Sequence, residues 1–179
     1  MKTIFLDRDG VINKDAGYVG KWADFHFLPG VVDALRILME KRFQIIIVTN
    51  QSGIARGYYT ESEYLDLEKM IEDHLSQLGI TITATYYCPH YPSGLVPEYS
   101  IECQCRKPKT GMLTRAAEEH SIDFSKSIMI GDKKSDMQAA QSVGIQNAYL
   151  IQSVQKEGLF NPGARNAIFK SLLECIKIL

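Results

Sequence analysis

The sequence predicts an α/β protein in which a mainly parallel central sheet is flanked by helices. Short β-branched apolar runs alternate with amphipathic stretches, which is the pattern of successive β-α-β units. The run at 43–48 is apolar throughout, as expected for a strand that is covered on both faces. Polar or charged residues follow several runs, where parallel strands would end at one edge. No internal repeat or linker interrupts the 179 residues, so we expect a single domain over 1–179.

The first half of the chain contains two predicted strands and two predicted helices. Residues 2–6 (KTIFL) form the first strand, a helix over 31–42 follows Pro29-Gly30, and the second strand covers 43–48. Thr60 and Glu63 have the spacing of a capping box and begin the second helix, which ends at Gly79. Its apolar stripe consists of Tyr64, Leu67, Ile71, Leu75 and Leu78.

The second half continues the alternation around one long irregular segment. Residues 88–108 contain Pro, Gly and Cys without a clear period, and a loop of that length is usually functional or held by cross-links. The other elements are strands over 80–87, 127–130 and 148–151, helices over 110–120 and 134–143, and a tail at 167–179 with a short strand and a closing helix. The stretches 10–30 and 57–80 are too short for a large cap domain.

Composition and charge exclude several classes of partner. The apolar content is 45% and the net charge is −1, so no global field would attract nucleic acid or an acidic membrane. No apolar run approaches the ~20 residues of a membrane span, and Asp7 comes too early for a signal-peptide core. We therefore expect a cytoplasmic monomer that binds a small molecule, with no nucleic-acid or membrane partner.

Two aspartates follow the first strand directly, in the stretch "IFLDRDGVIN". Asp7 and Asp9 are compatible with a solvated turn, because Asp-Gly commonly ends strands. A third carboxylate, Asp132, follows a later strand and would reach the same edge. Three neighbouring carboxylates repel each other unless they are neutralised, and Mg²⁺ prefers such oxygen ligands together with a phosphate oxygen. This arrangement favours covalent catalysis by an aspartate, with its neighbour as general acid and base.

Other polar residues near the predicted strand ends have both an ordinary and a functional interpretation. The segment "TNQSGIARG" is either a simple glycine-containing loop or a substrate loop in which Thr49 offers its hydroxyl to a phosphate. Lys107 and Lys133 are either solvated surface residues or cations that offset charge on a transferring phosphoryl group.

Three cysteines and a histidine are clustered in the irregular segment. Cys88 and His90 are separated by twelve residues from Cys103 and Cys105. Because thiols stay reduced in the cytoplasm, a closed tetrahedral zinc site explains this cluster better than disulfides do. Zinc would hold the loop 88–108 and thereby fix Arg106 and Lys107, which follow the last ligand. Cys175 is expected to pack in the core.

The motifs Asp7-x-Asp9-Gly, Thr49, Lys107 and Gly131-Asp132 resemble, in order, the four motifs of the haloacid-dehalogenase (HAD) phosphatase superfamily. This resemblance implies a Rossmann-like sheet, Asp7 as nucleophile, Asp9 as general acid and base, and Thr49 and Lys107 in the catalytic site. It also implies that Mg²⁺ is bound by the Asp7 and Asp132 carboxylates and by the Asp9 backbone carbonyl. Asp136, one helical turn later, would either support the metal or serve the start of the helix.

The zinc loop is similar to that of the branch containing heptose-bisphosphate phosphatases and histidinol-phosphate phosphatases, and its twelve-residue gap resembles the former. The resemblance implies removal of a heptose 7-phosphate in nucleotide-activated heptose and lipopolysaccharide biosynthesis. Histidinol phosphate remains an alternative substrate. A non-catalytic zinc-stabilised module and a nucleic-acid-binding zinc module are further alternatives. The implied substrate contacts are Asp15, Ala16, Gly17, Tyr18, Thr49, Asn50, Gln51, Ser52, Arg106, Lys107 and Lys133.

Overall fold

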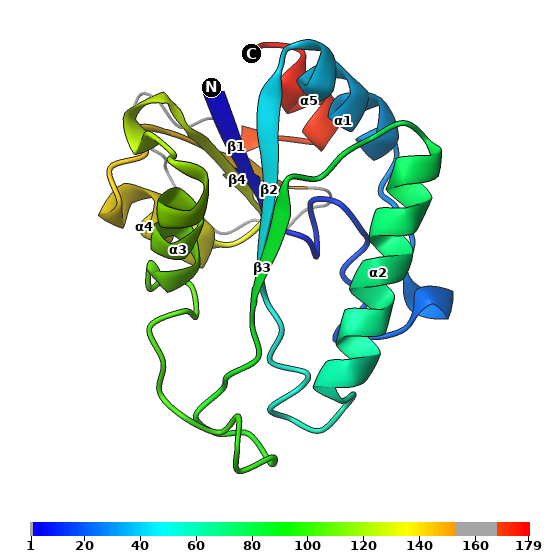
Figure 1. Cartoon of the computed structure of the whole chain (residues 1–179), viewed down its shortest axis with the longest axis vertical. Helices are drawn as coiled ribbons and strands as arrows, with labels where there is room; N and C mark the ends of the chain where they lie inside the picture. Colours follow the sequence, from blue (N-terminus) through cyan, green and yellow to red (C-terminus); the bar gives the residue numbers. More distant parts are fainter. Residues whose placement is uncertain (1, 153–167) are drawn as a thin grey trace.

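A six-stranded, entirely parallel sheet forms the centre of the computed structural model, which describes residues 2–152 and 168–179 (Figure 1). The strand order is β3-β2-β1-β4-β5-β6, so β1 lies in the middle between β2 and β4. This confirms the α/β class and the parallel sheet. The strands are β1 (Lys2–Leu6), β2 (Phe43–Asn50), β3 (Ala84–Cys88), β4 (Ile128–Gly131), β5 (Asn147–Ile151) and β6 (Ile168–Phe169).

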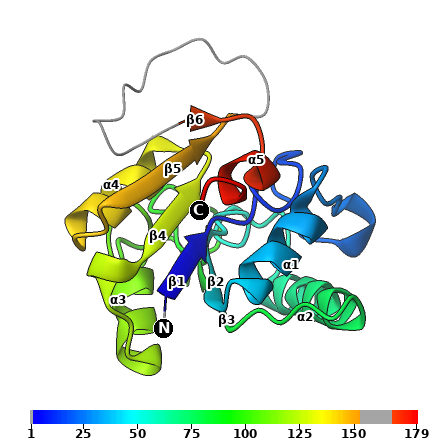
Figure 2. The same cartoon turned by 90° about the horizontal axis from the view of Figure 1, so that it is seen from above.

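Helices cover both faces of the sheet, as Figure 2 shows from above. The helices α1, α2 and α5 lie on one side, and α3 and α4 lie on the other. The helices are α1 (Val31–Glu40), α2 (Glu61–Gln77), α3 (Gly111–His120), α4 (Lys134–Ser142) and α5 (Leu172–Ile176), with short 3-10 turns at η1 (Trp22–Asp24) and η2 (Phe124–Lys126).

The sheet divides the hydrophobic core into two layers, because successive side chains of a strand point to opposite faces. In β1, Ile4 and Leu6 pack into the layer beneath α1, α2 and α5, whereas Phe5 packs beneath α3 and α4. In β2, Ile45 and Ile46 divide in the same way. Burial on both faces explains why the strands read as continuous apolar runs.

Several predicted boundaries were wrong by a few residues. The first helix ends at Glu40 rather than 42, because the chain turns at Arg42, whose φ of 59° lies in the left-handed region. The predicted strand over 80–87 begins only at Ala84, since the buried Ile80 and Ile82 pack against the helical layer beside the sheet. The remaining shifts are small. Among the strands, β2 extends to residue 50, β3 extends to 88, β4 covers 128–131 and β5 begins at 147. Among the helices, α3 begins at 111 and α4 ends at 142.

The other sequence expectations for the fold concern the tail and the short stretches. The predicted short strand and closing helix of the tail are β6 and α5; Ala167, the first residue of that pattern, lies outside the described residues. The stretch 10–30 contains only loops and η1, and 57–80 is occupied by α2. Among the helices described, none combines the length and apolar character that crossing a membrane would require.

Candidate active site

The carboxyl ends of the central strands bring three aspartates together. Asp7 follows β1, and its backbone N–H donates to the carbonyl of Ile130 in β4 at 2.9 Å. Asp132 follows β4, and Asp136 lies in the first turn of α4. Each of the three offers a carboxylate oxygen, and these atoms all lie within 4.8 Å of one another. Such a cluster of oxygen donors is suited to a hard divalent cation.

Lys107 provides the positive charge within this cluster. Its Nζ lies 3.1 Å from Asp7 Oδ1 and 2.6 Å from Asp136 Oδ1, and it donates to the Val48 carbonyl at 2.6 Å. Burial lowers the pKa of Lys107, but the neighbouring Asp136 and Asp7 raise it more, so the ammonium stays charged. Burial and Asp136 raise the pKa of Asp7, while Lys107 acts in the opposite direction.

Asp132 is the carboxylate with unused binding capacity. Its Oδ1 is buried and has no hydrogen-bond partner among the described residues. Burial, together with the charge of Asp7, raises the pKa of Asp132 to about 7. An orphaned buried acceptor is costly, and a bound cation would remove that cost. The oxygens of Asp136 are already engaged, because Oδ1 pairs with Lys107 and Oδ2 accepts from the Lys133 backbone N–H at 3.0 Å.

Two glycines allow the backbone to approach these carboxylates closely. A Cβ atom on Gly10 would lie 2.4 Å from Asp132 Oδ2, and Gly10 also has a φ of +86°. A Cβ atom on Gly131 would lie 2.3 Å from the Asp136 Cβ. Both distances are far below a van der Waals contact, so only glycine fits at either position.

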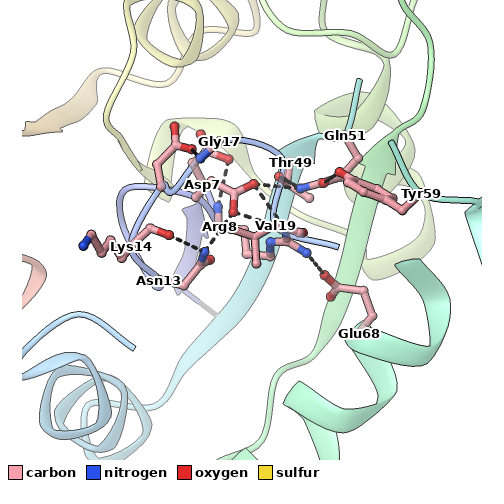
Figure 3. A network of polar contacts seen from close by, with 12 residues as sticks. Asp7, Arg8, Asn13, Lys14, Gly17, Val19, Thr49, Gln51, Tyr59 and Glu68 are labelled. Atoms are coloured by element: carbon pink, nitrogen blue, oxygen red, sulfur yellow. Dashed lines mark hydrogen bonds and ion pairs between the residues drawn. The ribbon is translucent and has the colours of Figure 1, made fainter. Parts of the chain in front are cut away.

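Arg8 joins Asp7 to a wider network of hydrogen bonds (Figure 3), which also holds the second aspartate, Asp9: the Arg8 backbone N–H donates to Asp7 Oδ1 at 2.8 Å. Asp9 Oδ1 accepts from Asn13 Nδ2 at 2.9 Å, and Oδ2 accepts from Gln51 Nε2 at 2.9 Å. Arg8 Nη2 contacts both Asp9 oxygens, at 3.1 and 3.2 Å. The carboxylate is therefore held by three side chains at the edge of the site.

A chain of polar contacts continues from this aspartate to β2. Gln51 Nε2 also donates to the Thr49 hydroxyl at 2.9 Å, and the Tyr59 hydroxyl donates to Gln51 Oε1 at 2.6 Å (Figure 3). Because a carboxylate only accepts hydrogen bonds, the Gln51 NH2 group faces Asp9 and the Gln51 Oε1 faces the Tyr59 hydroxyl. The sequence predicts Thr49 and Asn50 in a loop after the second strand. In the structure they are instead the last two residues of β2.

Asp9 and Gln51 line a pocket of about 460 Å³, a size typical of small-molecule sites. Ser135 and Tyr59 also line it, and no sequence signal had singled them out. Thr49 is buried and Ala16 is exposed, and neither is part of the lining. The lining residues that were expected from the sequence are Asp9, Asp15, Gly17, Tyr18, Asn50, Gln51, Ser52, Arg106, Lys107 and Lys133.

Cations lie at the rim of this pocket. Lys133 Nζ pairs with Asp15 Oδ2 at 3.1 Å, and its pKa is raised because the nearby Asp132 and Asp7 outweigh the effect of burial. The Arg106 guanidinium lies 5.3 Å from the Tyr91 ring centroid and donates to the His90 carbonyl at 3.3 Å. The positive charges of Lys133 and Arg106 make the entrance of the pocket suited to an anionic ligand.

The four predicted zinc ligands converge in the loop 88–108. Cys88 Sγ lies 3.0 Å from Cys105 Sγ and 3.6 Å from Cys103 Sγ, and His90 Nδ1 lies 3.3 Å from Cys105 Sγ. Contacts from Cys88 and His90 lower the pKa of Cys105 to about 5, which favours a thiolate. Four soft donors in one compact group could hold a metal ion.

A pair of hydrogen bonds joins this loop to the sheet. The Lys107 backbone N–H donates to Asn50 Oδ1 at 3.0 Å, and Asn50 Nδ2 donates to the Lys107 carbonyl at 3.1 Å. The Asn50 side chain thus fixes the peptide that carries the buried ammonium. The loop is also tied to Ala55, whose carbonyl accepts from two backbone N–H groups at 95–96.

A parallel α/β sheet with this carboxylate and lysine cluster at its carboxyl edge defines a phosphatase of the HAD-like hydrolase superfamily. The model of the family described as HAD-hydrolase-like matches residues 104–175. A structure of D,D-heptose 1,7-bisphosphate phosphatase from B. bronchiseptica, in complex with magnesium and phosphate, has a TM-score of 0.86 and 29% identity and covers 99% of this chain and 97% of that one.

Curated relatives are more similar still in sequence. The D-glycero-beta-D-manno-heptose-1,7-bisphosphate 7-phosphatase of Yersinia pestis is 43% identical, over 97% of this chain and 93% of the relative. The D-glycero-alpha-D-manno-heptose-1,7-bisphosphate 7-phosphatase of Photorhabdus laumondii is 44% identical, over 86% and 84% respectively. The chain belongs to the family of heptose-1,7-bisphosphate 7-phosphatases.

Proposed function

We propose that this protein removes the 7-phosphate of D-glycero-D-manno-heptose 1,7-bisphosphate, in the synthesis of nucleotide-activated heptose for lipopolysaccharide or related glycans. The observation that carries this proposal is the cluster of Asp7, Lys107 and Asp132, which adjoins the pocket through Lys107, a residue that lines it together with Arg106 and Lys133. The similarity to the Yersinia pestis heptose-1,7-bisphosphate 7-phosphatase, which is 43% identical over 97% of this chain, supports the choice of substrate.

In the first step, a carboxylate oxygen of Asp7 attacks the phosphorus of the 7-phosphate. The bond between phosphorus and the sugar oxygen breaks, and Asp9 donates a proton to that oxygen as it leaves. In the second step, Asp9 takes a proton from water, which attacks the aspartyl phosphate and releases inorganic phosphate. Lys107 and the Thr49 hydroxyl would offset charge on the transferring group.

We further propose that Mg²⁺ is held by the carboxylates of Asp7 and Asp132 and by the backbone carbonyl of Asp9. The unpaired, buried Asp132 Oδ1 fits this assignment. When bound, the cation neutralises the carboxylates and lets an anionic phosphate approach Asp7. Asp136, whose two oxygens already contact Lys107 and the start of α4, would hold Lys107 rather than the cation.

A structural Zn²⁺ is proposed at Cys88, His90, Cys103 and Cys105. The four ligand atoms lie within 4.8 Å of one another, and three thiols with one imidazole nitrogen make a closed tetrahedral set. The remaining proposed contacts, among Asp15 to Tyr18 and Thr49 to Ser52, would bind the sugar and its second phosphate. Arg106 suits that phosphate because a guanidinium can bind it through two hydrogen bonds. The proposal includes a cytoplasmic monomer without nucleic-acid or membrane partners.

Parallel assays of phosphate release test this function. With Mg²⁺ present, we expect heptose 1,7-bisphosphate, in either anomer, to be hydrolysed with a higher kcat/KM than histidinol phosphate. Preference for histidinol phosphate would overturn the substrate assignment. The Asp7→Asn variant should fold normally and lose at least about 10³-fold in kcat, because an amide is a poor nucleophile. Undiminished turnover by that variant would overturn the covalent step.

A further inference from the structure

Arg8, which separates the two aspartates in sequence, is completely buried together with its charge. Its Nη1 donates to Glu68 Oε1 at 2.8 Å, whereas its Nη2 contacts Asp9 and donates to the Val19 carbonyl at 2.8 Å (Figure 3). A buried guanidinium is stable only when carboxylates compensate its charge. Burial lowers the pKa of Arg8, but Asp9 and Glu68 raise it more, so the guanidinium remains charged.

The second carboxylate comes from a distant part of the chain. Glu68 lies in α2, one helical turn after Tyr64, whose ring centroid is 5.5 Å from the Arg8 Cζ. Tyr64 and Leu67 are buried and fix this face of the helix against the core. Glu68 does not line the active-site pocket, so it has no direct access to a bound substrate.

The geometry connects Glu68 to the carboxylate of Asp9. Arg8 Nη2 lies almost equally far from the two Asp9 oxygens, at 3.1 and 3.2 Å, so the guanidinium sets the orientation of that carboxylate. The guanidinium is planar, and the Glu68 contact at its other terminal nitrogen stops it from rotating. A carboxylate that transfers protons must be held within about 0.5 Å of its productive position.

We propose that Glu68 is a positioning residue, which anchors Arg8 so that Asp9 is held in one orientation at the edge of the pocket. This inference depends on the proposed function, because it assumes that Asp9 protonates the leaving oxygen. Glu68 itself touches neither the substrate nor the reacting atoms. A salt bridge that only stabilises the fold would not affect proton transfer selectively, and this difference can be measured.

The dependence of the rate on the leaving group distinguishes the two roles. When the phosphorus–oxygen bond of an alkyl phosphate breaks, the alkoxide needs the proton of Asp9. A p-nitrophenolate leaves readily without a proton. For both substrates, kcat/KM reports on the steps up to the first phosphoryl transfer, so the second step does not enter the comparison. Misplacement of Asp9 therefore lowers kcat/KM much more for the alkyl phosphate.

The test compares Glu68→Gln with the control Glu72→Gln, which removes the same charge from an exposed position one turn later in α2. For Glu68→Gln we expect a loss in kcat/KM of about tenfold or more with heptose 1,7-bisphosphate, and of less than about threefold with p-nitrophenyl phosphate. The Glu72→Gln variant should remain within about twofold of the wild type on both substrates. Thermal unfolding establishes that each variant is folded at the assay temperature.

Equal losses on the two substrates, or no loss on either, would overturn the positioning role. If Glu68→Gln does not fold, Glu68→Asp keeps the charge but shortens the reach to Arg8, and the same selective loss is expected, to a smaller extent. A wild-type protein that releases phosphate from no phosphoester would refute the proposed function itself. An active wild type whose Glu68 variants behave like Glu72→Gln would refute only the role of Glu68.

Discussion

Replacement of Lys107 by methionine should destabilise the metal-free protein strongly, because Lys107 is the buried cation between two carboxylates. Its Nζ lies 3.1 Å from Asp7 and 2.6 Å from Asp136, and all three side chains are nearly inaccessible to solvent. Methionine has a similar length but no charge. The Lys107→Met variant therefore leaves Asp7 and Asp136 buried without their counter-charge.

The size of this effect follows from the burial of the pair. Removal of one partner from a buried ion pair typically costs about 3–5 kcal/mol, because the remaining charge is left unpaired in a poorly polarisable environment. For a protein of this size, 1 kcal/mol corresponds to about 2–4 °C in Tm. We therefore expect Tm to fall by about 6–20 °C in the absence of Mg²⁺, as measured by circular dichroism or calorimetry.

The destabilisation should increase with pH. Burial and Asp136 already raise the pKa of Asp7, and the loss of Lys107 would raise it further. A carboxyl whose pKa is higher in the folded state binds its proton more tightly when folded. Its contribution to stability is therefore complete at low pH and is lost as the pH rises through the folded-state pKa. The difference in Tm between Lys107→Met and wild type should thus be larger at about pH 8 than at about pH 5.

Lys109→Met is the matched control, since it makes the same substitution two residues later. Lys109 pairs with Glu102 at 3.1 Å on a partly exposed surface, and such pairs contribute about 0–1 kcal/mol. Its Tm should change by only a few degrees. If Lys107→Met unfolded at the wild-type temperature at the higher pH, the reasoning about charge compensation would be refuted.

Two further predictions concern the loop and the rim of the pocket. Elemental analysis should find about one zinc per chain. Cys103→Ser should lower both the zinc content and the phosphatase activity, whereas Cys175→Ser, in the core, should keep the zinc. Protein purified without chelator but lacking zinc would contradict the proposed zinc site. Arg106→Lys should raise the KM for the bisphosphate about tenfold or more, because its second phosphate is bound by two hydrogen bonds from the guanidinium. The KM for a monophosphate should stay within about twofold of the wild-type value. Equal changes in both KM values in steady-state assays would argue that Arg106 does not bind the second phosphate.

The sheet and the two groups of possible metal ligands could be predicted from the sequence, because both depend on local patterns. The apolar runs and the capping box at Thr60 and Glu63 indicate elements directly, and the structure contains that capping box. The parallel topology then brings Asp7 and Asp132 to one edge without further information. Element boundaries were less predictable, since the turn at Arg42 depends on a left-handed backbone conformation that no apolar pattern signals.

The supporting residues of the site were not predictable in the same way. Asn50 is predicted to contact the substrate and lines the pocket, but no sequence pattern indicates that its side-chain amide is also hydrogen-bonded to the Lys107 backbone. Glu68 is a charged residue next to the apolar stripe of α2, and only the packing of that helix against the loop after β1 reveals its contact with Arg8. Tyr59 likewise reaches Gln51 through tertiary structure. Such contacts join segments whose separate patterns contain no information about each other.

The two glycines packed against Asp132 and Asp136 also constrain how this site can change over evolutionary time. A side chain at Gly10 or Gly131 would collide with Asp132 or Asp136, so neither position can be varied without displacing the reactive centre. Tyr18, Ser52 and Arg106 lie on loops at the opening, where substitutions leave the strand ends untouched. New substrate preferences should therefore arise by mutation at the opening, while the bond-breaking chemistry is inherited unchanged.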